Sequence, residues 1–290
     1  MNRIANYVVA YEATSQGHDA LELGVAMARL TDAELRICLV LQPVTAAPSK
    51  IYAASGDYEV LLADQAAEWL AAAAQLVPRD VRASTHLIWA DSTSEGLLQA
   101  AAEHDSDRIV VGAARGGILN RFTIGSVANA LLHASPVPVA LAPQGYRATA
   151  LTRITCAIGT RPGWEALLDS LAAFTEGLDV ELRFVTLVEV DAARDKHSAA
   201  AAGSTSHLDA VLAHYEGLVH GHGSISTAVG TGSTVEAAVE ALDWRDSELA
   251  FVGSSRLAAP RTIFLGITAH RMLHALPVPL IVVPNIPAAS

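Results

Sequence analysis

Residues 109–139 read IVVGAARGGILNRFTIGSVANALLHASPVPV and contain one structural unit in order. A buried-type strand is followed by a glycine-bearing loop, a Gly-Ser turn, a helix and a second buried-type strand. The arrangement returns at residues 250–281, AFVGSSRLAAPRTIFLGITAHRMLHALPVPLI. Five landmark pairs are each 141 residues apart: Gly112 and Gly253, Arg115 and Arg256, Gly125 and Gly266, His133 and His274, Pro136 and Pro277. The chain is therefore a tandem duplication.

Outside this unit, apolar strand-like segments alternate with segments of helical spacing. We expect further strands at residues 6–11, 35–41, 81–89, 154–158, 180–187 and 225–229. We expect helices from Ser15 and at residues 58–76, 164–174 and 208–219, with a polar, low-complexity loop at 191–206. Continuous apolar strands between helices are typical of parallel sheets covered on both faces. The predicted fold is α/β, with two five-stranded parallel-sheet domains at residues 1–148 and 149–290.

A capping box predicts where one helix of each half begins. Ser92 can accept a hydrogen bond from the amide of Glu95, whose carboxylate can reach back to the cap. The same pattern recurs from Ser233 to Glu236 and predicts a helix that runs through Leu242. The nearby residues 230–232, Gly-Thr-Gly, lack the third glycine of a dinucleotide-binding fingerprint, so we interpret them as a helix-start turn.

Charge and composition exclude several classes of function. A net charge of −11 opposes binding to nucleic acid or anionic membranes. The two lysines, Lys50 and Lys196, lie in no phosphate-binding P-loop motif. No uncharged apolar run approaches the roughly 18 residues of a membrane span, and no secretory signal begins the sequence, so we expect a cytoplasmic protein. Cys38 and Cys156 lie in apolar strands, as buried thiols do in a reducing compartment.

The repeated unit resembles the universal stress protein family in its tandem two-domain form. The signature of that family is G-x2-G-x9-G-[ST], followed by a helix and a final strand of the P-x-P-V type. Gly112, Gly125 and Ser126 match it in the first half, SPVPVALAP supplies the ending, and Arg115 replaces the middle glycine. The order of strands and helices matches over nearly the whole chain.

A backbone phosphate site explains such a signature. Glycines allow close approach to a polyphosphate, and a helix N-terminus after Gly125 offers free amides to an anion, with a hydroxyl from Ser126. We also expect Gly125 to adopt unusual dihedral angles. The adenine would lie at the carboxyl ends of the strands. The resemblance implies that Glu12 contacts the nucleoside and that Val40 lies near the base. The expected site for ATP, alone or with Mg²⁺, comprises Ala10, Tyr11, Glu12, Val40, Val111, Gly112, Arg115, Gly125, Ser126 and Val127.

The second half departs further from the signature. Gly159 stands at the acidic position, Arg256 at the middle glycine and Ile267 at the serine, so we expect this half to bind no nucleotide. Three interpretations of Arg115 stay open: it obstructs the loop, pairs with a phosphate, or points to water. The arginine at the equivalent position of the poorer copy favours a structural or inherited role.

Histidines and hydroxyls supply weaker hypotheses. His214, His220 and His222 could suggest a metal site, but no cysteine or carboxylate completes the pattern, which favours a solvated surface. His133 and His274 recur late in equivalent helices, which indicates a role in the fold. Ser126 lacks the surroundings of a nucleophile. We therefore predict no catalytic residue and no metal ligand.

Three functions remain open. The leading hypothesis is a stress-response or signalling module that carries an adenine nucleotide in its first half with little or no turnover. The alternatives are a nucleotide-free interaction protein and a slow ATPase, which the scarcity of lysine disfavours. The final strands, residues 137–141 and 280–283, would otherwise leave apolar sheet edges. Dimers of the family that this chain resembles commonly join through this strand, so we expect the two strands to join the halves as an intramolecular pseudo-dimer, while a homodimer through edge strands and an unknown protein partner remain open.

Overall fold

The computed structural model describes residues 4–43, 52–114, 122–160, 163–190, 197–219, 223–255 and 258–285, with the side chains of residues 52–57 and 197–202 left out. The first half contains β1 (Asn6–Ala10), α1 (Ser15–Thr31), β2 (Glu34–Leu41), α2 (Tyr52–Leu76), β3 (Ala83–Trp89), α3 (Thr93–Glu103), β4 (Arg108–Gly112), α4 (Ser126–Ala134) and β5 (Val139–Ala142). The second contains β6 (Arg153–Ala157), α5 (Glu165–Thr175), β7 (Glu181–Glu189), α6 (His197–Leu218), β8 (Ile225–Gly232), α7 (Val235–Glu240), β9 (Glu248–Gly253), α8 (Ile267–Ala275) and β10 (Leu280–Val283).

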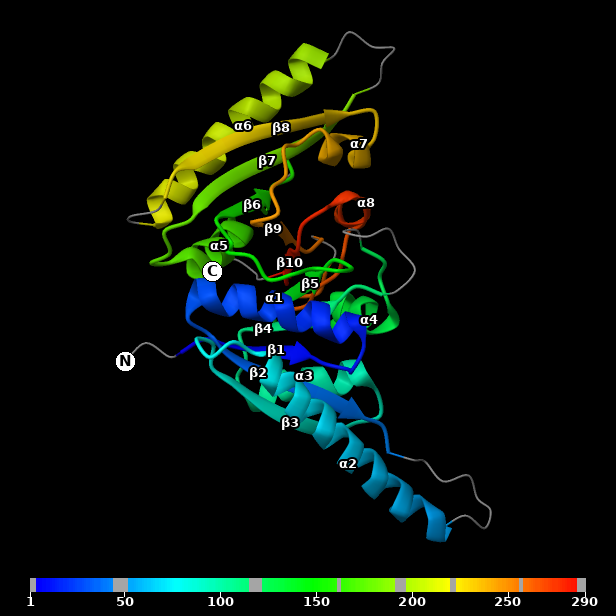
Figure 1. The fold of residues 1–290 in the computed structure, drawn as a ribbon. Coiled ribbons are helices and arrows are strands. Elements are labelled where there is room, and N and C mark those ends of the chain that lie inside the picture. Colours follow the sequence, from blue (N-terminus) through cyan, green and yellow to red (C-terminus); the bar gives the residue numbers. More distant parts are fainter. Residues whose placement is uncertain are drawn as a thin grey trace.

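The two halves share one ten-stranded sheet, in the order β3-β2-β1-β4-β5-β10-β9-β6-β7-β8. Strands within each half pair in parallel, whereas β5 and β10 pair antiparallel, with Ala140 opposite Ile281. Figure 1 shows these two strands at the centre, between the halves. The predicted pseudo-dimer is therefore confirmed, and each apolar final strand is protected by the other. A homodimer through edge strands would use β3 or β8 instead.

Each face of the sheet carries its own apolar core, and each core runs across both halves. The helices α1, α2, α5 and α6 contribute to one core, and α3, α4, α7 and α8 to the other. Strand residues divide between the two faces: Val9 belongs to the first core and Val8 to the second. This period-two alternation within an apolar strand is what a sheet covered on both faces requires.

The linker between the halves is held by carboxylates of α1. Asp19, buried, accepts a hydrogen bond from the amide of Gly145 at 2.8 Å, and Glu22 accepts one from the amide of Ala148 at 2.9 Å. Arg108 of β4 places its guanidinium 4.3 Å from the ring centre of Phe174 in α5, so a cation–π contact also joins the halves.

The second half contains a buried cluster of charged side chains. Glu248 of β9 is fully buried and accepts from Arg153 at 2.5 Å and from Arg183 at 2.7 Å, with Thr155 donating to the same carboxylate. The Arg183 guanidinium also lies 4.9 Å from the ring centre of Trp244. The cluster ties β6, β7 and β9 together at the end of the sheet where these strands begin.

Three local predictions were wrong. The low-complexity segment is helical from His197, because its alanines are the strongest helix formers. The second cap is Thr234, whose hydroxyl accepts from the amide of Ala237 at 3.2 Å, so the helix begins one residue later than the pattern at Ser233 implied, and it ends at Glu240. Gly230 and Gly232 belong to β8, where α7 packs so closely that a β-carbon would overlap its backbone.

Both cysteines are free and buried, as predicted. Across the parts of the chain that the structure describes, every helix is too short or too polar to cross a bilayer.

Candidate functional site

A cavity of about 250 Å³ opens where the strand order of the first half reverses. There β1 lies between β2 and β4, and the carboxyl ends of all three strands meet the first turns of α1, α3 and α4. Open parallel sheets bind their ligands at this kind of switch point. The cavity is lined by Ala10, Tyr11, Glu12, Gln16, Gly17, Cys38, Val40, Thr93, Leu97, Val111, Gly112, Ala114, Gly125, Ser126, Val127 and Ala128.

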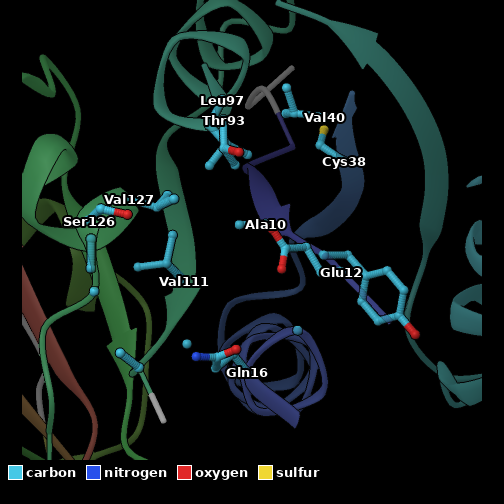
Figure 2. Close-up of a pocket in the computed structure, with 16 residues that line it drawn as sticks. Ala10, Glu12, Gln16, Cys38, Val40, Thr93, Leu97, Val111, Ser126 and Val127 are labelled. Atoms are coloured by element: carbon cyan, nitrogen blue, oxygen red, sulfur yellow. The ribbon is translucent and has the colours of Figure 1, made fainter. Parts of the chain in front are cut away.

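The structure brings together the site residues that the sequence predicted. Those around the cavity are Ala10, Tyr11, Glu12, Val40, Val111, Gly112, Gly125, Ser126 and Val127. Arg115 lies outside the described residues. Figure 2 shows Ser126 and Val127 on one side of the cavity and Cys38 and Val40 on the other, with Ala10 nearer the middle and Glu12 below Cys38 in this view.

Glu12 is positioned by a tight turn between β1 and α1. The amide of Tyr11 donates to the carbonyl of Cys38 at 2.9 Å, and the amide of Thr14 donates to the carbonyl of Glu12 at 2.7 Å. Thr14 then caps α1 through a hydrogen bond from the amide of Gly17 at 3.3 Å. A β-carbon at Gly17 would overlap the backbone of Glu12, so this glycine allows the helix to start directly behind the turn. This turn therefore fixes the backbone of Glu12, whose exposed side chain lines the cavity.

The N-terminus of α4 offers backbone donors to the cavity. Its cap residue is Gly125, which has no side chain to accept a hydrogen bond from the first turn, whereas Thr14 and Ser92 cap α1 and α3 with their hydroxyls. Ser126, the first helical residue, is exposed and adds a hydroxyl. Unsatisfied amides and the helix dipole make this turn suited to an anion.

The predicted reason for Gly125 was wrong. Its backbone angles, φ −80° and ψ 171°, are ordinary extended values that any residue adopts. The constraint is one of space: a β-carbon at residue 125 would lie 3.2 Å from the β-carbon of Ala114, which also lines the cavity. Ala114, just after β4, and Gly125, just before α4, therefore lie side by side at the wall of the cavity.

One part of the cavity wall is apolar and neutral. Ala10, Cys38, Val40 and Leu97 supply it, and Leu97 is fully buried. Burial raises the pKa of the Cys38 thiol to about 12, so the thiol stays protonated and behaves as a small apolar group. A flat aromatic base could pack against such a wall.

The cavity is poor in positive charge. Among the lining residues that the structure describes there is no lysine, arginine or histidine, and Glu12 contributes a carboxylate. An anion here would rely on the amides of α4, on hydroxyls, and on positive charge from elsewhere.

Sequence reasoning missed seven lining residues: Gln16, Gly17, Cys38, Thr93, Leu97, Ala114 and Ala128. Two of them could have been found. Thr93 follows the capping serine Ser92, and Gln16 lies in the first turn of the helix that follows Glu12, so both belong to helix starts at the carboxyl edge of the sheet. The other five are apolar or lack a side chain, and no pattern separates them from core residues.

The equivalent region of the second half is built differently. Among the described residues, apart from Gly159 and its chain neighbours, no atom lies within 4 Å of a β-carbon placed on Gly159, and Ile267, at the position of Ser126, is 82% exposed. Arg271 of α8 forms ion pairs with Glu236 of α7 at 2.7 Å and with Glu189 of β7 at 2.9 Å. The elements equivalent to α4, α3 and β2 are therefore bridged by side chains of the protein. Arg256 lies outside the described residues.

The suggested histidine metal site is not supported where it can be described. His214 packs edge-on against Trp164, with ring centres 5.3 Å apart. His220 and His222 lie outside the described residues. Within the described ranges, no group of three or more His, Cys, Asp and Glu side chains is arranged to hold a metal ion.

Comparisons with known proteins agree with the fold and the repeat. The sequence profile of the universal stress protein family matches residues 4–143 and again residues 151–284. Universal stress proteins Rv2319c of Mycobacterium tuberculosis and Mb2346c of Mycobacterium bovis are each 29% identical over 291 residues, which covers 96% of this chain and 99% of theirs. A universal stress protein from Archaeoglobus fulgidus has a similar fold, with a TM-score of 0.60 at 15% identity over 97% of this chain and 98% of that one. The protein PA1789 of Pseudomonas aeruginosa, described as functionally unknown, superposes with a TM-score of 0.58 at 15% identity over 97% of this chain and 93% of that one. This chain belongs to the universal stress protein family.

Proposed function

We propose that the first half binds ATP and that the chain is a stress-response or signalling module that carries this nucleotide with little or no turnover. The observation that supports binding is the cavity at the switch point, where the uncapped first turn of α4 faces an apolar wall. In this proposal the base packs against Cys38 and Val40, Glu12 accepts from the sugar, and Ser126 and the amides of α4 hold phosphate.

Charge balance decides what else the site needs. The phosphates of ATP carry several negative charges, while the described lining offers a carboxylate and neutral donors. Either Mg²⁺ or the side chain of Arg115 would supply the missing positive charge, since both are suited to phosphate oxygens. Binding that persists when Mg²⁺ is chelated would favour Arg115.

The same lining supports binding more than hydrolysis. Phosphoryl transfer is accelerated mainly by positive groups that stabilise the transferred phosphoryl and by residues that position the attacking water. The described walls supply no cationic side chain for this purpose. A slow, Mg²⁺-dependent ATPase activity that remains after repurification would contradict this part of the proposal.

The second half serves as a scaffold in this proposal. Arg271, Glu236 and Glu189 bridge the region that a nucleotide would need, and the exposed Ile267 replaces the phosphate-binding hydroxyl. Two free, buried thiols fit a reducing compartment, so we place the function in the cytoplasm. In this proposal an unidentified protein partner would distinguish the ATP-bound first half from the ATP-free one.

Titration calorimetry of ATP into nucleotide-stripped protein, with and without Mg²⁺, tests the proposal. Saturation at one site per chain supports it. No binding heat from the wild type but binding by Arg115→Gly would show that the arginine closes an otherwise intact site. No binding heat from either protein would reject ATP binding and leave the nucleotide-free interaction protein as the function. Ile267→Ser is the matched control, because a single change should not create a second site beside Arg271.

A further inference from the structure

Two histidines on α8 face each other across one helical turn. The Nε2 atoms of His270 and His274 lie 3.2 Å apart, and their rings meet edge to face with centres 4.7 Å apart. Both side chains are exposed to solvent. Residues four apart on a helix are neighbours on one face, and this spacing provides the two histidine ligands of helical zinc sites.

The distance between the two Nε2 atoms is close to the distance between two histidine nitrogens bound to one zinc ion. Zinc–imidazole bonds are about 2.0–2.1 Å long, and a tetrahedral arrangement then places two ligand nitrogens about 3.3 Å apart. The Nε2 atoms stand 3.2 Å apart, close to that separation, so a rotation of the exposed rings is enough to point both nitrogens at one ion. From this geometry we propose that His270 and His274 form a binding site for one zinc-class transition-metal ion, on the opposite half of the chain from the nucleotide cavity.

A third histidine, His133 on α4, lies close enough to His270 to act on it electrostatically. His133 belongs to the first half and packs edge-on against Phe264, with ring centres 5.4 Å apart. Since the described residues contain no triad of metal-binding spacing, water would complete the coordination of this two-histidine site.

The duplication provides an internal control. His133 occupies the position in α4 that His274 occupies in α8, and Asn129 occupies the position of His270. The first half therefore carries a histidine at one of the two equivalent positions and an asparagine at the other. Asn129 is exposed, and its carbonyl lies 2.7 Å from Nδ1 of His133, so Asn129→His should place a second facing pair on the surface without disturbing the core.

Zinc titration of the full-length, nucleotide-free chain tests the proposal, with equilibrium dialysis and metal analysis as the readout. We expect the wild type to saturate at one ion per chain, and His270→Gln and His274→Gln each to lose that ion. His214→Gln, which removes an exposed histidine of α6, should keep it. Asn129→His should raise the uptake to two ions.

Further readouts separate metal ligation from a structural effect. The metal-free variants should melt at the wild-type temperature, because both rings are exposed, and zinc should raise the melting temperature of the wild type alone. Uptake should fall as the pH is lowered, because the metal binds only unprotonated imidazole and competes with protons. Equal zinc uptake by the wild type and the His270→Gln/His274→Gln double variant, or no saturable uptake by the wild type, would overturn the proposal. An unchanged uptake by Asn129→His would contradict the claim that one-turn spacing on these helices holds the ion.

Discussion

Gly112, the last residue of β4, lies directly against the carbonyl of Gln16 in the first turn of α1. A β-carbon on residue 112 would overlap that oxygen and approach the carbonyl carbon to 2.8 Å. The first glycine of the motif is therefore needed for contact between a strand and a helix of the same half. Since both residues line the cavity, this contact also sets how close two of its walls stand.

Gly112→Ala should destabilise the protein by about 3 kcal/mol, at the upper end of the range for overpacking, because the obstructing atom belongs to the backbone and cannot rotate away. ATP binding should weaken as well, since α1 must shift at the cavity wall. Urea unfolding followed by circular dichroism measures the first effect and calorimetry the second.

Gly253→Ala is the matched change in the second half. There a β-carbon would meet the flexible side chain of Leu167 at 3.5 Å, an ordinary contact. We expect the stability to stay within about 0.5 kcal/mol of the wild type. Equal losses at Gly112 and Gly253 would refute the backbone-contact explanation.

The sequence predicted the fold well because its signals are local and repeated. Apolar strands, helical spacing and the 141-residue repeat identify every strand and the joining of β5 with β10. The wrong predictions fall where the residue type suggests one local structure and the packing of the fold produces another. The alanines after His197 read as low complexity yet form a helix, and the close packing of α7 on Gly230 and Gly232 involves residues that no short pattern connects.

The candidate site could be predicted in part. The motif and the residues that follow β1 lead to Glu12, Gly125 and Ser126, which converge on one cavity. Cys38 and Leu97 could not be found, because an apolar wall of a cavity has the same sequence pattern as the core. The reason for Gly125 was also hidden, since its contact with Ala114 depends on the path of the intervening chain.

Ser126→Ala should weaken ATP binding about tenfold or more, because a hydrogen bond to a charged group contributes roughly 1.5–3 kcal/mol net. The melting temperature should not change, since Ser126 is exposed and the N-cap residue of α4 is Gly125 and not Ser126. Titration calorimetry and a thermal melt of the same sample measure both. ATP affinity equal to that of the wild type would place the phosphates elsewhere.

Glu248→Gln should destabilise the protein by about 3–5 kcal/mol, because it removes the carboxylate that Arg183 pairs with and leaves Arg153 only the more distant Glu181, at 3.9 Å. Burial lowers the pKa of Arg183 even though the Glu248 carboxylate acts to raise it. Urea unfolding measures the loss. The exposed pair of Arg29 and Asp80 is the control, since Asp80→Asn should change stability far less.

The ion pairs of Arg271 should make stability depend on pH in the acidic range. Hydrogen bonding to Arg271 holds the pKa of Glu236 at about 2, below its ordinary value of 4.5. A carboxyl group whose pKa is lower in the folded state stabilises that state at pH values above 4.5, and this contribution disappears as pH falls through the folded value.

We therefore expect the wild type to exceed Glu236→Gln in stability by a constant amount above pH 4.5, and the difference to shrink between pH 4.5 and about 2. Arg271→Gln removes the same pair from the other side and should show the same trend, although it also loses the contact with Glu189. Urea midpoints measured across this pH range give the difference directly, and effects common to all other carboxylates cancel between paired samples. Because the pair is exposed, about 1 M salt should reduce the difference. A difference that stays constant from pH 5 to pH 2 would show that Glu236 does not stabilise the fold through its charge.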